Sequence, residues 1–243
     1  MLIMLSADSV LKEAPFIKYT ELGHFDFLPH SKYCLAEYDK NLYDDYLFTK
    51  LEQPFPCALK NASVKRKAEY LAGRYCGQRL LQNKASSTTI GTYQRVPQWP
   101  YGWCGSISHT EKYVIVVVVP QSVRLMPGID IENLSQSIAL ESVDMFASFE
   151  EKFFLLRSKL PYYIAVLILF SAKESLYKSI WNRVKRFLDF QLARIIELDD
   201  KQQSFTLTLT DSLTSTLRAG SKFNGRYAFF KDTIITYMMT PIE

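Results

Sequence analysis

Residues Tyr162 to Lys178 read YYIAVLILFSAKESLYK, and the interpretation of the rest of the chain depends on this stretch. Its first part, Tyr162 to Ala172, is almost entirely apolar. That run is too short to cross a bilayer, which takes about 20 residues. The continuation keeps a helical period, so the sequence predicts a buried helix over residues 162–187, whole or broken near its middle.

One glutamate lies within the apolar stripe of this helix. At about 100° per residue, Phe170, Tyr177 and Trp181 fall on one arc, with Glu174 inside it and Lys178 at its edge. A carboxylate among apolar side chains is costly unless it is paired or bound to a metal ion. The pattern predicts that Lys178 or a cation holds Glu174. The alternative is an ordinary surface ion pair between residues four apart.

A second helix and its strands divide the chain into two halves. Residues 63–82 predict a helix that begins behind a cap at Asn61 or Ser63, and residues 113–119, YVIVVVV, predict a strand buried on both faces. Each half, 1–120 and 121–243, then consists of a helix packed on a small antiparallel sheet, with a ligand site expected in the cleft between them. We further expect short strands and turns over residues 1–60, a helix at 148–158, and strands at 193–198, 205–210, 226–231 and 233–238.

Residues Gly128 to Glu132 read GIDIE, which alternates apolar and acidic side chains. In a strand, Ile129 and Ile131 would point into the core, and Asp130 and Glu132 would lie side by side on the opposite face. Neighbouring carboxylates repel unless a cation joins them or one is protonated, and Mg²⁺ prefers such oxygen ligands. The strand therefore predicts a magnesium site. The alternative is an amphipathic edge strand whose acids face water.

Two further segments have side chains suited to phosphate. Residues 105–110, GSISHT, predict a turn in which Ser108, His109 and backbone N–H groups hold a phosphate, although His109 could instead be a general base. Arg66, Lys67 and Arg74 project from the first helix within about 100° of one another and could bind a second phosphate. The alternatives are a solvated turn and a solvated helix face.

Composition narrows the class of protein. The chain has 243 residues, 48% hydrophobic and 14% aromatic, which excludes disordered and low-complexity classes. Its net charge of +4 admits an acidic partner or a phosphate ligand but is too small to indicate nucleic acid. Four cysteines without a CxxC pair predict reduced thiols and a cytoplasmic protein. We expect no signal peptide and no transmembrane segment.

Taken in order, five motifs resemble those of the 4′-phosphopantetheinyl transferases, specifically the broad-specificity type that serves siderophore and surfactin synthetases, including the enterobactin synthetase component D group. The motifs are RKAEYLAGR (Arg66–Arg74), RVPQWP (Arg95–Pro100), GSISHT (Gly105–Thr110), GIDIE (Gly128–Glu132) and FSAKESLYK (Phe170–Lys178).

This resemblance implies an α+β fold with two similar halves, coenzyme A as donor, Mg²⁺ as cofactor, and a serine of an apo carrier protein (peptidyl, aryl or acyl carrier) as acceptor. Asp130 and Glu132 resemble the metal ligands, and Glu174 resembles a third ligand or the base that takes the serine proton. Lys178 resembles the lysine that contacts the pyrophosphate. By the same resemblance, the contacts to the remainder of coenzyme A would come from Arg66, Arg74, Arg95, Pro97, Ser108 and His109.

Two departures and two rival functions bear on this resemblance. Thr110 stands where serine or cysteine is more usual, and residues 1–60 match no motif. One rival is a holo-acyl-carrier-protein synthase for fatty-acid synthesis, a type about half as long as this two-halved chain. The other is a non-catalytic module that binds acidic partners, which would have no need for the three carboxylates Asp130, Glu132 and Glu174.

Overall fold

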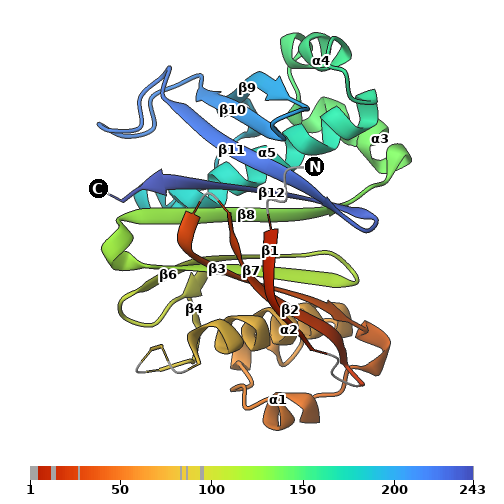
Figure 1. Ribbon diagram of the computed structural model, residues 1–243, viewed down its shortest axis with the longest axis vertical. Coiled ribbons are helices and arrows are strands. Elements are labelled where there is room, and N and C mark those ends of the chain that lie inside the picture. Colours follow the sequence, from red (N-terminus) through yellow and green to blue (C-terminus); the bar gives the residue numbers. More distant parts are fainter. Residues whose placement is uncertain are drawn as a thin grey trace. The chain divides into compact units, whose positions relative to one another are not determined.

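The computed structural model of the chain describes residues 5–11, 15–26, 28–82, 84–85, 87–93 and 96–242. The chain divides into two compact units, an N-terminal unit that ends at Leu125 and a C-terminal unit that runs from Met126 to Ile242. Figure 1 follows both units in sequence order by colour. The fold class predicted from the sequence is confirmed, because each unit places one long helix on an antiparallel sheet.

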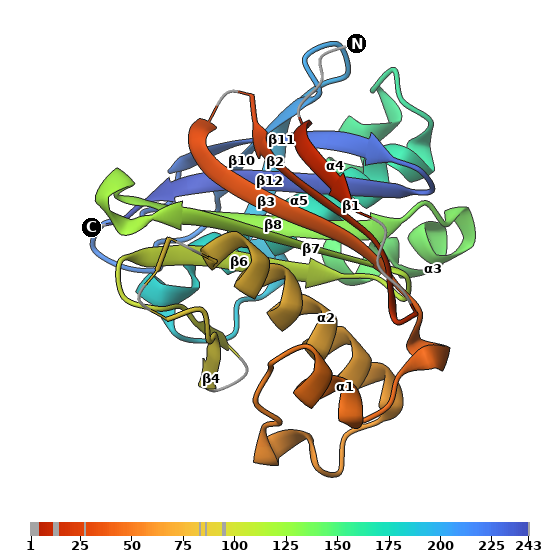
Figure 2. The ribbon, with the colours of Figure 1, turned by 60° about the horizontal axis from the view of Figure 1, so that its bottom comes forward.

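The N-terminal unit is built on a five-stranded sheet in the order β1-β2-β3-β7-β6, with antiparallel neighbours. The long helix α2 packs against β3, β6 and β7 (Figure 2). Its cap is Ser63, whose side chain accepts a hydrogen bond from the Arg66 backbone. The elements are β1 (Leu5–Leu11), β2 (Ile17–Phe25), β3 (Leu28–Tyr38), α1 (Tyr46–Lys50), α2 (Val64–Leu81), β4 (Gly91–Tyr93), β5 (Val96–Gln98), β6 (Trp103–His109) and β7 (Tyr113–Pro120).

The prediction of short strands over residues 1–60 is wrong. Strands β2 and β3 have 9 and 11 residues, and with β1 they form three of the five strands of the sheet. They pair with each other over most of their length, and the second half of β3 also pairs with the buried strand β7, so Cys34 and Ala36 are fully buried. Local composition, with its prolines and polar residues, does not reveal such long-range pairing.

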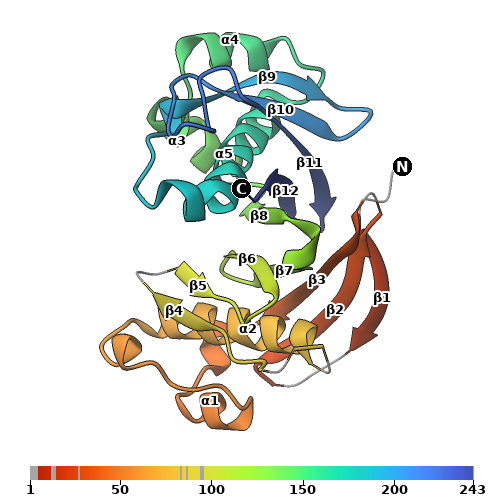
Figure 3. The ribbon, with the colours of Figure 1, turned by 90° about the vertical axis from the view of Figure 1, so that its left-hand side faces the viewer.

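The C-terminal unit has a second five-stranded sheet in the order β8-β12-β11-β10-β9. Helix α5 lies along this sheet next to β12 (Figure 3). It is one unbroken helix of 23 residues that ends where Lys185 adopts a left-handed backbone with φ 52°. The elements are β8 (Leu125–Asn133), α3 (Gln136–Phe146), α4 (Phe149–Leu156), α5 (Tyr162–Val184), β9 (Ala193–Asp199), β10 (Ser204–Leu209), β11 (Lys222–Phe230) and β12 (Thr233–Pro241).

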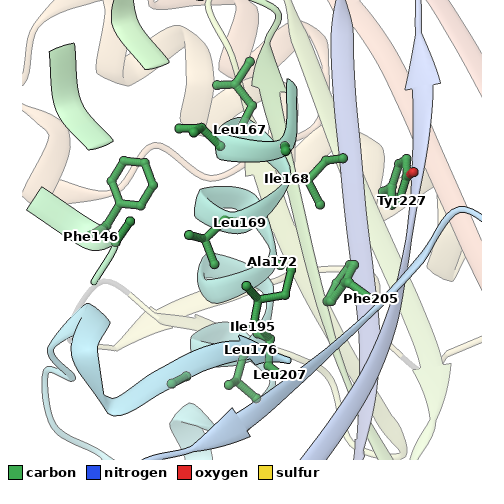
Figure 4. Packing of buried hydrophobic residues seen from close by; sticks show 14 of the residues in the cluster. Phe146, Leu167, Ile168, Leu169, Ala172, Leu176, Ile195, Phe205, Leu207 and Tyr227 are labelled. Carbon is green, nitrogen blue, oxygen red and sulfur yellow. The ribbon is translucent and has the colours of Figure 1, made fainter. Parts of the chain in front are cut away.

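The core of the C-terminal unit is formed by one side of α5. Leu169, Ala172 and Leu176 recur at helical spacing and pack against Ile195 and Leu207 of the sheet (Figure 4). Among the described residues, no helix combines the length and the apolar character that crossing a membrane requires. The adjoining side of α5 has small polar residues that face β8 and β12, and it is this side that positions the candidate site.

Candidate active site

Asp130 lies on the face of β8 that α5 covers. Gly128, two residues before it and therefore on the same face, is so close to the helix that a Cβ atom would lie 1.8 Å from the Ser175 carbonyl oxygen. The prediction that this face lies opposite the core is therefore wrong. Ile129 and Ile131, on the other face of the strand, are fully buried. The helix can approach this closely because Gly128 has no side chain and the α5 residues nearest to it, Ser175 and Ser179, are small.

The carboxylate of Asp130 is buried and has a separate partner for each oxygen. Its exposed fraction is 2%. Ser171 Oγ donates to Oδ2 at 2.8 Å, and Lys178 Nζ donates to Oδ1 at 2.6 Å. A buried charge needs such pairing, and hydrogen bonds from an ammonium group to a carboxylate are among the strong ones. Lys178 is thus brought to Asp130, a pairing that the sequence did not predict.

Glu132 and Glu174 lie in surroundings that oppose their charge. Burial, followed by the negative charges of Asp130 and Glu174, raises the pKa of Glu132 to about 8, while Lys178 opposes this rise. Burial also raises the pKa of Glu174, with Asp130 adding to the rise and Lys178 opposing it. The three predicted carboxylates are therefore close enough to repel one another, a situation that an added cation relieves.

The donor set suits Mg²⁺ in its chemistry. Within the described residues, no three or more His, Cys, Asp or Glu side chains are arranged as a metal-binding group. Asp130, Glu132 and Glu174 nevertheless offer the hard carboxylate oxygens that Mg²⁺ prefers, and their mutual repulsion favours a divalent cation. These three residues are the ones that would hold it.

The buried residue Lys173, next to Glu174 in the sequence, links α5 to neighbouring segments of the C-terminal unit. The sequence did not predict this role. Lys173 is fully buried and donates to Glu151 Oε2 at 2.9 Å, to the Phe146 carbonyl at 2.8 Å and to the Phe190 carbonyl at 2.9 Å. All three ammonium protons therefore have acceptors. The available signal was a lysine directly after the apolar run that ends at Ala172. Because α4 begins at a Ser148–Glu151 capping box, this contact ties α5 to the start of α4.

The N-terminal unit gathers several predicted nucleotide contacts around one small cavity. Its volume is about 180 Å³, and a neighbouring pocket of about 940 Å³ shares part of its wall. Four of the predicted residues line the small cavity: Arg66, Arg74, Pro97 and His109. Glu69, Tyr70, Gly73, Thr92 and Ile107 complete its wall.

Arg66, Glu69 and His109 form a polar cluster at this cavity. Arg66 Nη1 lies 3.4 Å from His109 Nε2 and 3.6 Å from Glu69 Oε2. Glu69 Oε2 also lies 3.6 Å from His109 Nε2. The sequence did not single out Glu69, although its position three residues after Arg66 on a helix was a usable signal. Arg66 and His109 offer groups that suit a phosphate, whereas the Glu69 carboxylate beside them opposes an anion.

The prediction of a turn at residues 105–110 is wrong for most of its length. Residues Trp103–His109 form strand β6 and pair one by one with β7. Successive side chains of a strand point to opposite faces. His109 lies on the face that lines the cavity with Ile107, whereas Ser106 and Ser108 are buried on the other face. Ser108 and His109 therefore do not point their side chains to the same place.

Arg74 is a buried cation in the cavity wall. It donates from Nη2 to the Gly91 carbonyl at 3.0 Å and to Thr92 Oγ1 at 2.7 Å, and it stacks over the Tyr70 ring at 4.3 Å. Burial lowers its pKa, and its Nε finds no hydrogen-bond partner among the described residues. Arg74 thus joins β4 to α2 and adds a buried positive charge to the cavity wall. The third predicted arginine, Arg95, lies outside the described residues.

Comparison with known proteins gives two adjacent family matches. Residues 55–119 match a family model described as the 4′-phosphopantetheinyl transferase N-terminal domain, and residues 126–235 match one for the 4′-phosphopantetheinyl transferase superfamily. All the described candidate residues lie within these two segments.

Curated relatives agree with these matches. Enterobactin synthase component D of Salmonella typhimurium is 40% identical over 128 residues, which cover 52% of this chain and 53% of that protein, so the match spans about half of the relative's length. The Escherichia coli K12 protein of the same name is 35% identical over 143 residues, 57% of this chain and 67% of the relative. The 4′-phosphopantetheinyl transferase Npt of Nocardia iowensis is 30% identical over 142 residues, 56% and 62% of the two chains. The chain therefore belongs to the 4′-phosphopantetheinyl transferase superfamily.

Proposed function

We propose that this protein transfers the 4′-phosphopantetheine arm of coenzyme A to a serine hydroxyl of an apo carrier protein, in a reaction that needs Mg²⁺. The observation that carries the proposal is the grouping of Asp130, Glu132 and Glu174 with Lys178 in the C-terminal unit. Three mutually repelling carboxylates beside one lysine suit a divalent cation and a pyrophosphate. Membership of the transferase superfamily supports the same conclusion.

The cavity of the N-terminal unit would bind the nucleotide end of coenzyme A. Arg66 and His109 supply polar groups for the 3′-phosphate, and the buried guanidinium of Arg74 adds positive charge to the same wall. Tyr70 and Pro97 add ring surfaces in the same wall. Ser108 and Arg95 remain predicted contacts.

In the proposed reaction, Asp130, Glu132, Glu174 and Lys178 have different roles. The serine oxygen attacks the β-phosphorus of the pyrophosphate, a new O–P bond forms, and the bond to the bridging oxygen breaks, releasing adenosine 3′,5′-bisphosphate. The serine proton passes to Glu174, the carboxylate that we propose as the base. Lys178 stabilises negative charge on the pyrophosphate oxygens. When bound by Asp130, Glu132 and Glu174, Mg²⁺ supplies further charge neutralisation.

The acceptors we propose are carrier domains of siderophore synthetases or of other nonribosomal peptide and polyketide synthases. The names of the Salmonella and Escherichia relatives, enterobactin synthase component D, support this class. We place the reaction in the cytoplasm, and the four cysteines, all free thiols, are consistent with that compartment. A comparison of kcat/KM for a siderophore-type carrier and a fatty-acid acyl carrier protein distinguishes this proposal from the fatty-acid alternative.

Mass spectrometry of the carrier tests the proposal. The protein is incubated with coenzyme A, Mg²⁺ and an apo peptidyl carrier domain, and we expect the carrier to gain the mass of one phosphopantetheine arm. A carrier whose acceptor serine is replaced by alanine, and a reaction with EDTA, should show no gain. If no apo carrier of either class gains mass at saturating coenzyme A and Mg²⁺, the proposed activity is wrong and a binding module is favoured.

A further inference from the structure

Three buried hydroxyl groups form a row behind Asp130. Ser171 and Ser175 lie one turn apart on α5, and Thr236 lies on β12, the strand next to β8. All three residues are fully buried. The Thr236 hydroxyl lies 2.8 Å from both serine hydroxyls, and Ser171 Oγ continues the row to Asp130 Oδ2 at 2.8 Å.

The protons of this row can be counted. Each hydroxyl has one proton, whereas a carboxylate and a carbonyl only accept. Ser171 donates to Asp130, and Ser175 donates to the Thr236 carbonyl at 3.0 Å. The Thr236 hydroxyl proton is then left for one of the two serine oxygens. When Thr236 donates this proton to Ser171, Ser171 is held from two sides, by the hydroxyl behind it and by the carboxylate in front of it.

This arrangement fixes the rotation of the Asp130 carboxylate. The last torsion of an aspartate is broad and about two-fold, so an unanchored carboxylate turns easily. Ser171 holds Oδ2, which leaves Oδ1 toward Lys178. Groups that orient a ligand in this way commonly set metal affinity, because they remove the cost of arranging it.

We propose that Ser171 and Thr236 are positioning residues that orient Asp130 for the divalent cation. This inference rests on the proposed function, in which Asp130 is a metal ligand. The row joins α5, β8 and β12, so it couples the geometry of the carboxylate to the packing of the helix on the sheet. Neither residue touches the reacting atoms in this role.

The competing interpretation is that these serines serve only close packing of α5. Ser179, one turn after Ser175, provides the matched control. It is equally buried, with 1% exposed, and it lies on the same side of the helix. Its hydroxyl donates to the Leu176 carbonyl at 2.7 Å, within its own helix. Removing this hydroxyl tests helix packing without altering the row behind Asp130.

The experiment measures metal binding without turnover. Mn²⁺, which accepts similar oxygen ligands, is titrated into the full chain in the presence of coenzyme A, and free Mn²⁺ is followed by electron paramagnetic resonance. We expect Ser171→Ala to raise the Kd for Mn²⁺ roughly 10- to 100-fold. Thr236→Val keeps the side-chain shape and should raise the Kd by a smaller factor. Ser179→Ala should leave the Kd unchanged.

Thermal unfolding of each variant separates affinity from folding. An unchanged Kd in folded Ser171→Ala and folded Thr236→Val overturns the inference and leaves the proposed function standing. Equal rises in all three variants also overturn it, because packing alone then explains them. If the unaltered protein binds no Mn²⁺, the metal-ligand assignment itself is wrong, and this inference fails with it. If Ser171→Ala does not fold, Thr236→Val alone decides.

Discussion

At the scale of single residues, Glu132 should make the metal-free protein less stable as pH rises. Its pKa is raised from 4.5 to about 8 in the folded chain, chiefly by burial and then by the charge of Asp130. Between these values the folded state keeps a proton that the unfolded state has released, so the free energy of unfolding falls as pH increases. Glu132→Gln removes this titration.

The measurement is urea unfolding with EDTA at pH 5 and at pH 8. Between these two conditions the unaltered protein should lose about 1 kcal/mol or more of stability relative to Glu132→Gln. Parallel pH dependence in the two proteins would show that the Glu132 carboxylate titrates normally and that its surroundings do not oppose its charge.

Glu174→Gln tests the residue that we propose as base. The change keeps the shape of the side chain but removes its charge and basicity. Turnover should fall by about 10² or more, the scale of lost general-base catalysis, while calorimetry should still detect binding of coenzyme A. Glu141→Gln, an exposed position on α3, serves as the control. Full turnover in Glu174→Gln would remove Glu174 from the mechanism, and loss of binding as well would make it chiefly a metal ligand.

At the scale of elements, the contact between β8 and α5 depends on Gly128. A Cβ there would lie 1.8 Å from the Ser175 carbonyl oxygen and 2.9 Å from Ser179 Cβ, so the strand and the helix would have to separate. We expect Gly128→Ala to lower the free energy of unfolding by about 2–3 kcal/mol, the upper range for overpacking. In Gly91→Ala, where the nearest atom is Gln98 Cβ at 3.5 Å, the cost should be much smaller. If urea unfolding showed equal losses of stability for Gly128→Ala and Gly91→Ala, α5 would not pack so closely on β8.

Two lysine–carboxylate pairs of the C-terminal unit allow a matched comparison. Lys173 pairs with Glu151 with both side chains buried, whereas Lys152 pairs with Asp144, whose side chain is 79% exposed. Lys173→Met leaves a buried carboxylate without its cation and should cost about 3–5 kcal/mol in urea unfolding. Lys152→Met should cost about 1 kcal/mol or less. Similar costs would show that Lys173 does not fasten α5.

Sequence periodicity predicted the helices and strands whose own residues show a clear hydrophobic pattern. It did not predict strands that form because they pair with residues distant in the sequence. The apolar run of α5 and the β-branched run of β7 were found because helix and strand periods are local. Residues 105–110 have the composition of a turn, yet they form most of β6 because β7 pairs with them. The length of strand β3 was not predicted for the same reason.

The candidate site was also predicted where the pattern is local and not where it depends on contacts between distant residues. Alternation in GIDIE placed Asp130 and Glu132 on one face, as the contacts of β8 require. Burial of that face under α5 was not predictable from the strand, because it depends on Gly128 meeting a serine 47 positions later. Ser171 and Thr236 are 65 positions apart, so their contact follows from the packing of β12 and not from any local pattern.

At the scale of the whole molecule, two units of similar design hold different chemistry. The cavity of the N-terminal unit is lined by two arginines, a histidine and a glutamate, and its arginines suit phosphate. The C-terminal unit has clustered carboxylates, which suit a cation. The chain belongs to a transferase superfamily whose two family models match these units separately. We propose that transfer occurs at the Asp130 cluster.

The most direct measurement of that claim compares Asp130→Asn with Asp144→Asn, an exposed aspartate of the same unit. The rate of mass gain by an apo peptidyl carrier domain is followed with coenzyme A and Mg²⁺, after thermal unfolding has confirmed that both variants are folded. We predict that Asp130→Asn loses at least about 100-fold in transfer rate, because one ligand charge is gone, and that Asp144→Asn transfers at the normal rate. Normal transfer by folded Asp130→Asn would contradict the assignment of this cluster as the active site.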